Sequence, residues 1–200
     1  MRLVFAGTPE PALGSLVLGQ LARRLGLPLR CAGNFSTSKR PDGQAMQQAM
    51  MSMLSAVQCG ANYILHSAGF LDGLLSMSYE KFVMDCDMCG ALHAYLGGVE
   101  VSDDSLGVEA LAQYGPGEHL FGTDHTLRHY QTAYWDSGLN DDQPWETWDE
   151  QGAEDYAVRA NARWKQLLHD YQAPPLDFDT DMALRDFIAR EKASKEDMWY

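Results

Sequence analysis

Three short polar segments each follow an apolar run that is typical of a buried strand. They span residues 7–10, 34–44 and 66–73. In parallel α/β folds, functional groups gather at the carboxyl ends of the strands. We therefore expect any chemistry of this chain to lie in these three segments.

His66 is the best single candidate for a catalytic residue. It closes the apolar run 63–65, and the small residues Ser67, Ala68 and Gly69 that follow leave room for a ligand. A neutral imidazole donates a proton, accepts one or ligates a metal near pH 7. A structural hydrogen bond is the competing interpretation of a histidine in this position.

The other two segments supply charged and polar side chains. Asp72 either orients His66 or attracts a cationic substrate, and capping of a following helix is the alternative. Lys39, Asp42 and Gln44 crowd the second segment, where an ion pair next to a helix cap would also explain them. Glu10 adds a carboxylate to the first segment.

A group of histidines follows at His119, His125 and His129. The last two are four residues apart and would share a helix face, a spacing that zinc enzymes use. Thr126 stands where an HExxH motif would have its glutamate. We favour a packed and capped helix start over a metal site, and zinc binding through the three histidines is the alternative.

Cysteine usage indicates neither a disulfide framework nor a redox centre. Cys86 and Cys89 form a lone CxxC inside an expected helix, with no second CxxC and no redox βαβ context. Cys31 and Cys59 stand alone. We expect all four to be buried or half-buried thiols, because a free cysteine behaves mostly as a small hydrophobic residue.

The elements that must position these residues alternate between strand and helix in the first hundred residues. Apolar runs and Gly/Pro breaks predict strands at 3–6, 28–33 and 62–66, and helices at about 11–25, 43–58 and 78–97. Three consecutive βα units imply parallel strands with helical crossovers.

The second hundred residues carry helix signals without strand signals. Helices are predicted at about 103–114, 124–134, 153–171 and 180–196. We therefore expect two domains, an α/β domain over 1–100 and an acidic helical extension over 101–200 that packs on it.

Composition and charge limit the possible function classes. The 200-residue chain is 46% hydrophobic with a net charge of −13, all of it in residues 101–200. An acidic surface repels phosphate backbones, so nucleic-acid binding is not expected. No stretch predicts a membrane span or a signal peptide, and we expect a soluble, cytoplasmic protein.

Three motifs in a fixed order resemble one known family. They are STSKRPDGQA at 36–45, HSAGFLDG at 66–73 and GPGEHLFGTDHTL at 115–127. Together they resemble the C-terminal part of the trimethylamine methyltransferase (MttB-like) family of corrinoid-dependent methyltransferases, from about residue 7 to residue 192. Glu118 replaces what is more usually a glycine in the third motif.

The resemblance implies the last three βα units of a TIM (β/α)₈ barrel, followed by a C-terminal helical extension. It also implies methyl transfer from trimethylamine or a glycine-betaine-like amine to the Co(I) of a corrinoid. The corrinoid (cobalamin) would be carried by a cognate partner protein and would not be bound covalently here. Family members are more than twice as long, so the partners expected also include an N-terminal barrel half or further copies of the chain. A non-catalytic fragment or subunit, functional only when another chain completes it, is the alternative.

The resemblance also suggests roles for individual residues. His66, with Ser67 and Gly69 beside it, would face the corrinoid or the substrate, and Asp72 would be its partner or the counter-charge of the ammonium. Lys39 would bind a substrate carboxylate. The remaining residues expected to bind substrate are Phe35, Phe70, Asp42, Gln44 and Glu10, the two aromatic rings through cation–π contacts.

Overall fold

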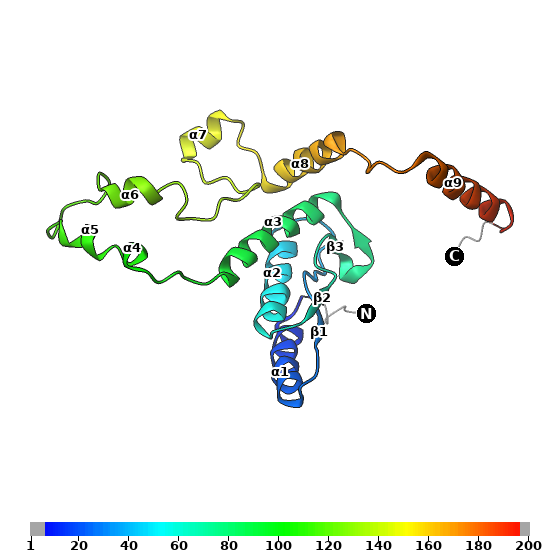
Figure 1. Cartoon of the computed structure of the whole chain (residues 1–200), viewed down its shortest axis with the longest axis horizontal. Helices are drawn as coiled ribbons and strands as arrows, with labels where there is room; N and C mark the ends of the chain where they lie inside the picture. The colour runs from blue at the N-terminus through cyan, green and yellow to red at the C-terminus, as the bar shows by residue number, and fades with distance from the viewer. Residues whose placement is uncertain (1–6, 197–200) are drawn as a thin grey trace. The chain divides into compact units, whose positions relative to one another are not determined.

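The computed structural model describes residues 7–196 of the chain. The strand predicted at 3–6 lies outside the described residues. The helices are α1 (Pro9–Leu25), α2 (Gly43–Gln58), α3 (Tyr79–Leu96), α4 (Asp103–Leu106), α5 (Val108–Ala112), α6 (Asp124–His129), α7 (Trp145–Glu150), α8 (Tyr156–Asp170) and α9 (Phe178–Ala193) (Figure 1). The strands are β1 (Arg30–Ala32), β2 (Tyr63–Leu65), β3 (Phe70–Leu71) and β4 (Ser76–Met77), with a short 3₁₀ helix at Asp72–Leu74.

The first part of the fold is a parallel βα arrangement. Strands β1 and β2 pair in parallel with Cys31 opposite Ile64, and α2 connects them. This is the α/β topology that the sequence predicts. The described residues form two two-stranded sheets and no closed barrel.

Helix α2 forms where predicted because its start and its buried face are both encoded locally. The Asp42 carboxylate accepts the Ala45 N–H at 3.0 Å and caps the first turn. The buried side chains recur at helical spacing, at Ala45, Ala49, Met53 and Ala56. Two of them, Ala49 and Met53, pack against Met88 and Leu92 of α3.

A small hairpin between β2 and α3 was not predicted. Phe70 pairs with Met77 in antiparallel strands of two residues each. The turn requires positive φ at Asp72 (49°), Gly73 (62°) and Leu74 (78°). An Asp-Gly dipeptide favours such turns, but strands this short leave no alternation of apolar and polar residues to detect.

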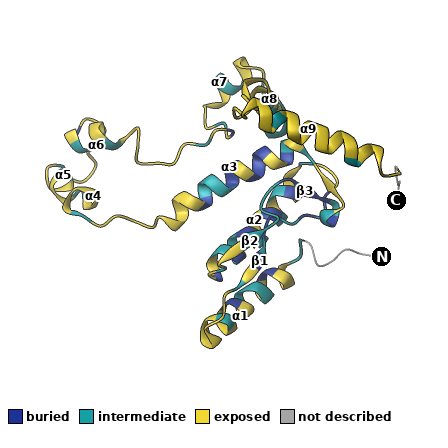
Figure 2. Cartoon of the chain, turned by 45° about the vertical axis from the view of Figure 1, so that its right-hand side comes forward, coloured by how far each residue is buried: buried dark blue, intermediate teal, exposed yellow. Residues whose placement is uncertain are grey.

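Part of the acidic segment packs on α3, which Figure 2 colours partly as buried. Leu139 and Ala160 are buried against Val83 and Met84. The Glu80 carboxylate accepts hydrogen bonds from the side chains of α8, from Asn161 Nδ2 at 2.6 Å and Trp164 Nε1 at 2.8 Å. These contacts join α8 to α3.

The helices of the extension are shorter than predicted. The helix expected at 103–114 is divided into α4 and α5 at Gly107, which has φ +60°, and the helix expected at 124–134 ends at His129. Helix α7 was not predicted. None of the helices in the described part of the chain is both long and apolar enough to cross a membrane.

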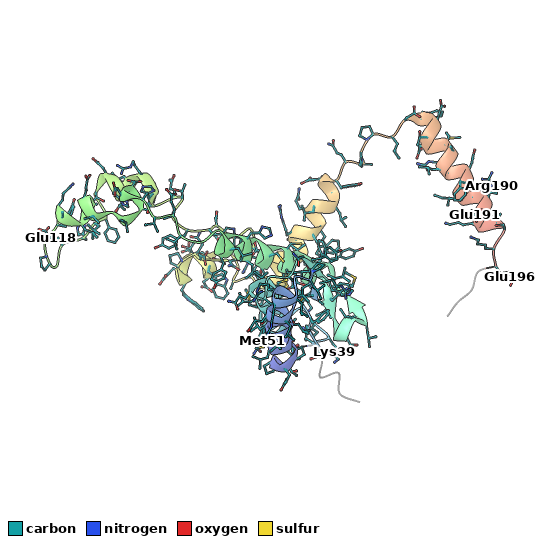
Figure 3. All side chains as sticks on the ribbon, turned by 60° about the horizontal axis from the view of Figure 1, so that its bottom comes forward. Lys39, Met51, Glu118, Arg190, Glu191 and Glu196 are labelled. Carbon is teal, nitrogen blue, oxygen red and sulfur yellow. The ribbon has the colours of Figure 1, made fainter. Side chains whose placement is uncertain are left out.

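The chain divides into two compact units, Met1–Lys165 and Gln166–Tyr200. The division does not fall at residue 100, and the domain boundary expected there stays a prediction. In the second unit, Asp177 caps α9 by accepting the Thr180 N–H at 3.0 Å. Its Arg190 and Glu191 lie near the C-terminal end of this helix (Figure 3).

The four cysteines are free thiols. Cys31 and Cys59 are buried with their sulfurs 3.7 Å apart, and Cys89 is half-buried. Cys86 is exposed on α3, so the expectation of a buried or half-buried thiol is wrong for this residue. The two cysteines of the CxxC lie three residues apart on α3. They differ in exposure because the helix directs the Cys86 side chain further towards solvent than that of Cys89.

Candidate functional site

The aromatic cluster of Phe35, His66 and Phe70 lies where the strand ends meet. Because β1 and β2 are parallel neighbours, the residues that follow them come together at one edge of the sheet. The His66 ring lies 5.8 Å from the Phe35 ring and 4.9 Å from the Phe70 ring, edge-on to the latter at 88°. All three side chains are half-buried. Their expected roles in binding substrate or a corrinoid stay predictions.

His66 combines an unusual backbone conformation with an uncommitted side chain. Its φ is +55°, in the left-handed region that non-glycine residues rarely adopt. Within residues 7–196, the imidazole makes ring contacts and no hydrogen bond. A half-buried imidazole in this state can still bind a ligand or transfer a proton.

The segment after His66 is fixed by groups from two other elements. Asn34, fully buried after β1, donates from Nδ2 to the Ser67 carbonyl. Asp85 of α3 accepts the Gly69 N–H at 2.8 Å. The Ser67 hydroxyl donates to the carbonyl of Ile64 at 3.0 Å. Ser67 and Gly69 therefore shape the segment, and their expected role in binding a cofactor stays a prediction.

Asp85 forms a buried ion pair with Lys81, one turn earlier on α3. Both side chains are fully buried, and Lys81 Nζ donates to both carboxylate oxygens. Burial lowers the pKa of Lys81 and raises that of Asp85, while the attraction between the two charges opposes both shifts. Sequence analysis missed this pair, whose only signal is an opposite-charge i, i+4 spacing that usually lies in solvent.

Lys39, in the segment after β1, pairs with Asp72, which directly follows β3. Lys39 Nζ lies 3.0 Å from Asp72 Oδ1 and donates to the Thr37 carbonyl at 2.8 Å. The Lys39 side chain is 70% exposed and that of Asp72 30%. Among the described residues Asp72 does not bond to His66, so the expected His66–Asp72 pairing is not formed. The ion pair in this loop joins Lys39 to Asp72, not to Asp42.

Asp42 and Gln44 serve the structure of the second segment. Asp42 caps α2 and accepts the Ser38 hydroxyl at 2.9 Å, and these hydrogen bonds hold the pKa of its carboxyl below the usual value. Gln44 Nε2 donates to the Thr37 hydroxyl at 3.3 Å. Their expected role in binding substrate stays a prediction, as does that of Glu10. Glu10 lies exposed in the first turn of α1 without a hydrogen bond or ion pair to the aromatic cluster in the described structure.

Gln48 organises the same segment, and sequence analysis missed it. Its Oε1 accepts hydrogen bonds from the Ser36 hydroxyl at 3.0 Å and the Thr37 N–H at 2.9 Å. It lies on α2 between Gln44 and Ser52, one turn away on either side, and this row of polar side chains on a helix with buried alanines was the available signal.

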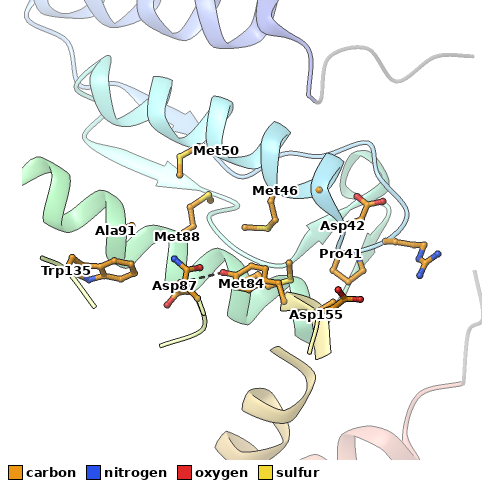
Figure 4. A pocket seen from close by; sticks show the side chains of 15 residues that line it. Pro41, Asp42, Met46, Met50, Met84, Asp87, Met88, Ala91, Trp135 and Asp155 are labelled. Atoms are coloured by element: carbon orange, nitrogen blue, oxygen red, sulfur yellow. Dashed lines mark hydrogen bonds between the residues drawn. The ribbon is translucent and has the colours of Figure 1, made fainter. Parts of the chain in front are cut away.

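A cavity of about 690 Å³ lies between α2 and α3, apart from the aromatic cluster (Figure 4). Four methionines line it, with the aromatic rings of the acidic segment on another side: Met46, Met50, Met84, Met88, Trp135 and Tyr156. No residue of the aromatic cluster lines this cavity. Thioether side chains adapt to many apolar shapes, so the cavity carries little information about a particular ligand.

Comparison with known proteins assigns the chain to a family. The sequence profile of the family described as trimethylamine methyltransferase (MTTB) matches residues 4–196. The chain belongs to this family.

Individual relatives point to the same group of proteins. The chain is 37% identical over 184 residues to the glycine betaine methyltransferase of Desulfitobacterium hafniense strain Y51, covering 92% of this chain and 38% of the relative. It is 33% identical over 175 residues to the trimethylamine methyltransferase MttB2 of Methanosarcina mazei, covering 86% of this chain and 34% of the relative. The chain thus spans little more than a third of the length of these relatives.

Proposed function

We propose that this chain takes part in methyl transfer from a quaternary or tertiary methylated amine, and that the aromatic cluster binds the methylated nitrogen. The observation that supports the proposal is the meeting of Phe35, His66 and Phe70 at one strand-end edge. A quaternary ammonium has no proton to donate and is held by aromatic faces and nearby carboxylates. The Asp72 carboxylate, two residues after Phe70, would supply such a charge.

Glycine betaine is the substrate we favour over trimethylamine. Lys39 pairs with Asp72, and its exposed ammonium can also pair with a substrate carboxylate. Trimethylamine has no carboxylate and would use the aromatic cluster and Asp72 alone. The similarity to a glycine betaine methyltransferase supports the same choice.

Of the three residues expected to bind a corrinoid, one has a side chain that is available for it. Among Ser67, Gly69 and His66, only His66 has a polar side chain that makes no hydrogen bond within residues 7–196. A corrinoid carried by a partner protein supplies, when bound, the cobalt nucleophile that accepts the methyl group. The tasks of this chain are to bind the ammonium, to orient its C–N bond and to exclude water from the cluster.

The short parallel sheet supports a further part of the proposal. We place β1, α2, β2 and α3 as consecutive units of a (β/α)₈ barrel that is completed by an N-terminal barrel half on another chain or by further copies. Parallel strands need cover on both edges, and β1 and β2 have no other strand partner among residues 7–196. A subunit that is inactive until another chain completes it is therefore the second candidate function.

Binding experiments test the proposed substrate site. We would titrate the purified chain with glycine betaine and with tetramethylammonium, which lacks the carboxylate, and follow binding by NMR. Phe70→Leu should weaken both ligands by about 2- to 30-fold, because a cation–π contact contributes about 0.5–2 kcal/mol. Lys39→Met should weaken glycine betaine alone, by about 2- to 5-fold, as expected for an exposed ion pair.

Phe121→Leu is the matched control, because Phe121 is 79% exposed and lies outside the aromatic cluster. Equal effects of Phe70→Leu and Phe121→Leu would contradict the proposed site. Methyl transfer to cob(I)alamin would then be measured for the chain alone and with the part of a relative that precedes the matched region. Turnover only in the second case would support the subunit that needs completion.

A further inference from the structure

The segments that carry α4 and α6 bring three metal-ligating side chains together. Asp104 of α4 and His125 and His129 of α6 place one ligand atom each within 4.8 Å of one another. The two helices lie side by side in Figures 1 and 2. We propose that Asp104, His125 and His129 form a zinc-binding site.

The two histidines are aligned by their helix. Thr123 caps α6 by accepting the Thr126 N–H at 3.0 Å, so the helix begins just before His125. The imidazole rings then lie on one face with their centroids 4.7 Å apart. His125 Nε2 is 2.7 Å from the Asp104 carbonyl oxygen, and His129 Nε2 is 2.7 Å from Asp104 Oδ2.

One oxygen of the Asp104 carboxylate is held by a hydrogen bond while the other faces the histidines, as is common for carboxylate ligands of metals. Arg128 holds Oδ1 at 2.8 Å, which leaves Oδ2 directed at His129. Metal ligands are commonly oriented by a second hydrogen bond of this kind.

The ligand set and its surroundings favour zinc. Two imidazole nitrogens and one carboxylate oxygen suit Zn²⁺ rather than Mg²⁺ or Ca²⁺, which prefer oxygen ligands. Three protein ligands leave a fourth position for water. A polar cavity of about 350 Å³ includes Asp104 and His125 in its lining. Its charged lining residues are four carboxylates and one guanidinium, an excess of negative charge that attracts a cation: Asp103, Asp104, Glu109, Asp124 and Arg128.

The site differs from the three-histidine alternative considered from sequence. His119 stacks on Phe121 at 5.5 Å and is not part of the cluster. The third ligand is instead Asp104, which lies 21 residues before His125 in the sequence. Zinc would bind the unprotonated Nε2 of each neutral ring, whose proton would then sit on Nδ1, and the Asp104 carboxylate would be the third ligand.

Zinc binding by the purified full-length chain tests the site. We expect one equivalent of Zn²⁺ by equilibrium dialysis, retained in a large excess of Mg²⁺. His125→Ala and His129→Ala should each weaken binding by tenfold or more. His119→Ala is the matched control and should bind as the unmodified chain does. Loss of zinc in excess Mg²⁺, equal affinity in all variants, or no stoichiometric zinc would overturn the proposal.

Two further measurements separate ligation from misfolding. Asp104→Asn keeps the size of the side chain but should also weaken zinc binding tenfold or more, with unchanged helical circular dichroism. Zinc should slow amide hydrogen exchange in residues 102–129 of the unmodified chain and not in His129→Ala. Zinc-induced protection of the same residues in both proteins would contradict the assignment.

Discussion

Replacement of Lys81 by methionine should strongly destabilise the first unit. Lys81 and Asp85 are both fully buried, and Lys81 Nζ contacts both oxygens of the carboxylate. Lys81→Met preserves most of the side-chain volume but leaves a buried carboxylate whose remaining hydrogen-bond partner among the described residues is the Gly69 N–H. Removal of one partner of a buried ion pair costs about 3–5 kcal/mol.

The exposed pair of Lys39 and Asp72 provides the matched control. It joins the same residue types at 3.0 Å, but the Lys39 side chain is 70% exposed. Lys39→Met should cost less than about 1 kcal/mol. The contrast between the two methionine variants isolates the contribution of burial.

Urea unfolding followed by tryptophan fluorescence measures both variants. With a denaturant dependence of about 1–3 kcal/mol per molar urea, Lys81→Met should shift the midpoint by about 1 M or more. The double variant Lys81→Met/Asp85→Asn should recover most of the loss, because an asparagine oxygen can still accept the Gly69 N–H and no charge remains unpaired. If Lys81→Met cost no more than Lys39→Met, the buried pair described here would be refuted.

Three further predictions follow from other contacts. Hydrogen bonds lower the pKa of Glu80 to about 2. The contribution of the Glu80 carboxylate to stability is therefore complete above about pH 4.5 and is lost as the pH falls towards 2. The difference in unfolding midpoint between the unmodified chain and Glu80→Gln should shrink over this range. Asn34 has φ +52°, so Asn34→Ala should be less stable than Asn34→Gly by about 1–2 kcal/mol in urea unfolding, and the reverse order would contradict the assigned backbone conformation. Cys86 is exposed while Cys31 and Cys59 are buried, so mass spectrometry of the folded chain after brief iodoacetamide treatment should find Cys86 modified first, and earlier modification of Cys31 would contradict the fold.

Sequence patterns predicted the elements that local signals encode. Helix α2 was predicted with its observed ends because the Asp42 cap and the spacing of Ala45, Ala49 and Met53 are contained in one segment. Strands β1 and β2 were predicted at their approximate positions because each is an apolar run between breaks. The family motifs also identified the family correctly, since they occur in order along nearly the whole chain.

Contacts between distant segments could not be predicted in the same way. A sequence shows that Asp72 follows His66 by a few residues, but the left-handed residues of the hairpin turn direct Asp72 to Lys39 instead. Asp104 belongs to a different helix from His125, and nothing in the spacing of the two reveals their contact. Contacts between residues of one helix could be predicted from their spacing, whereas contacts with residues of another segment could not.

The segment 66–69 connects the stability of the fold with the proposed function, because its backbone is fixed while the His66 imidazole is free of hydrogen bonds among the described residues. Asn34 and the buried Lys81–Asp85 pair hold the backbone of Ser67 and Gly69, and therefore fix the strained position of His66. The imidazole itself carries none of these restraints within the described residues. A fixed backbone with an imidazole free of hydrogen bonds suits a binding site, because the backbone entropy of the segment is lost on folding and not on ligand binding. Asp85→Ala should accordingly weaken glycine betaine binding although Asp85 lies outside the aromatic cluster, and unchanged affinity in a folded Asp85→Ala variant would show that the buried pair serves stability alone.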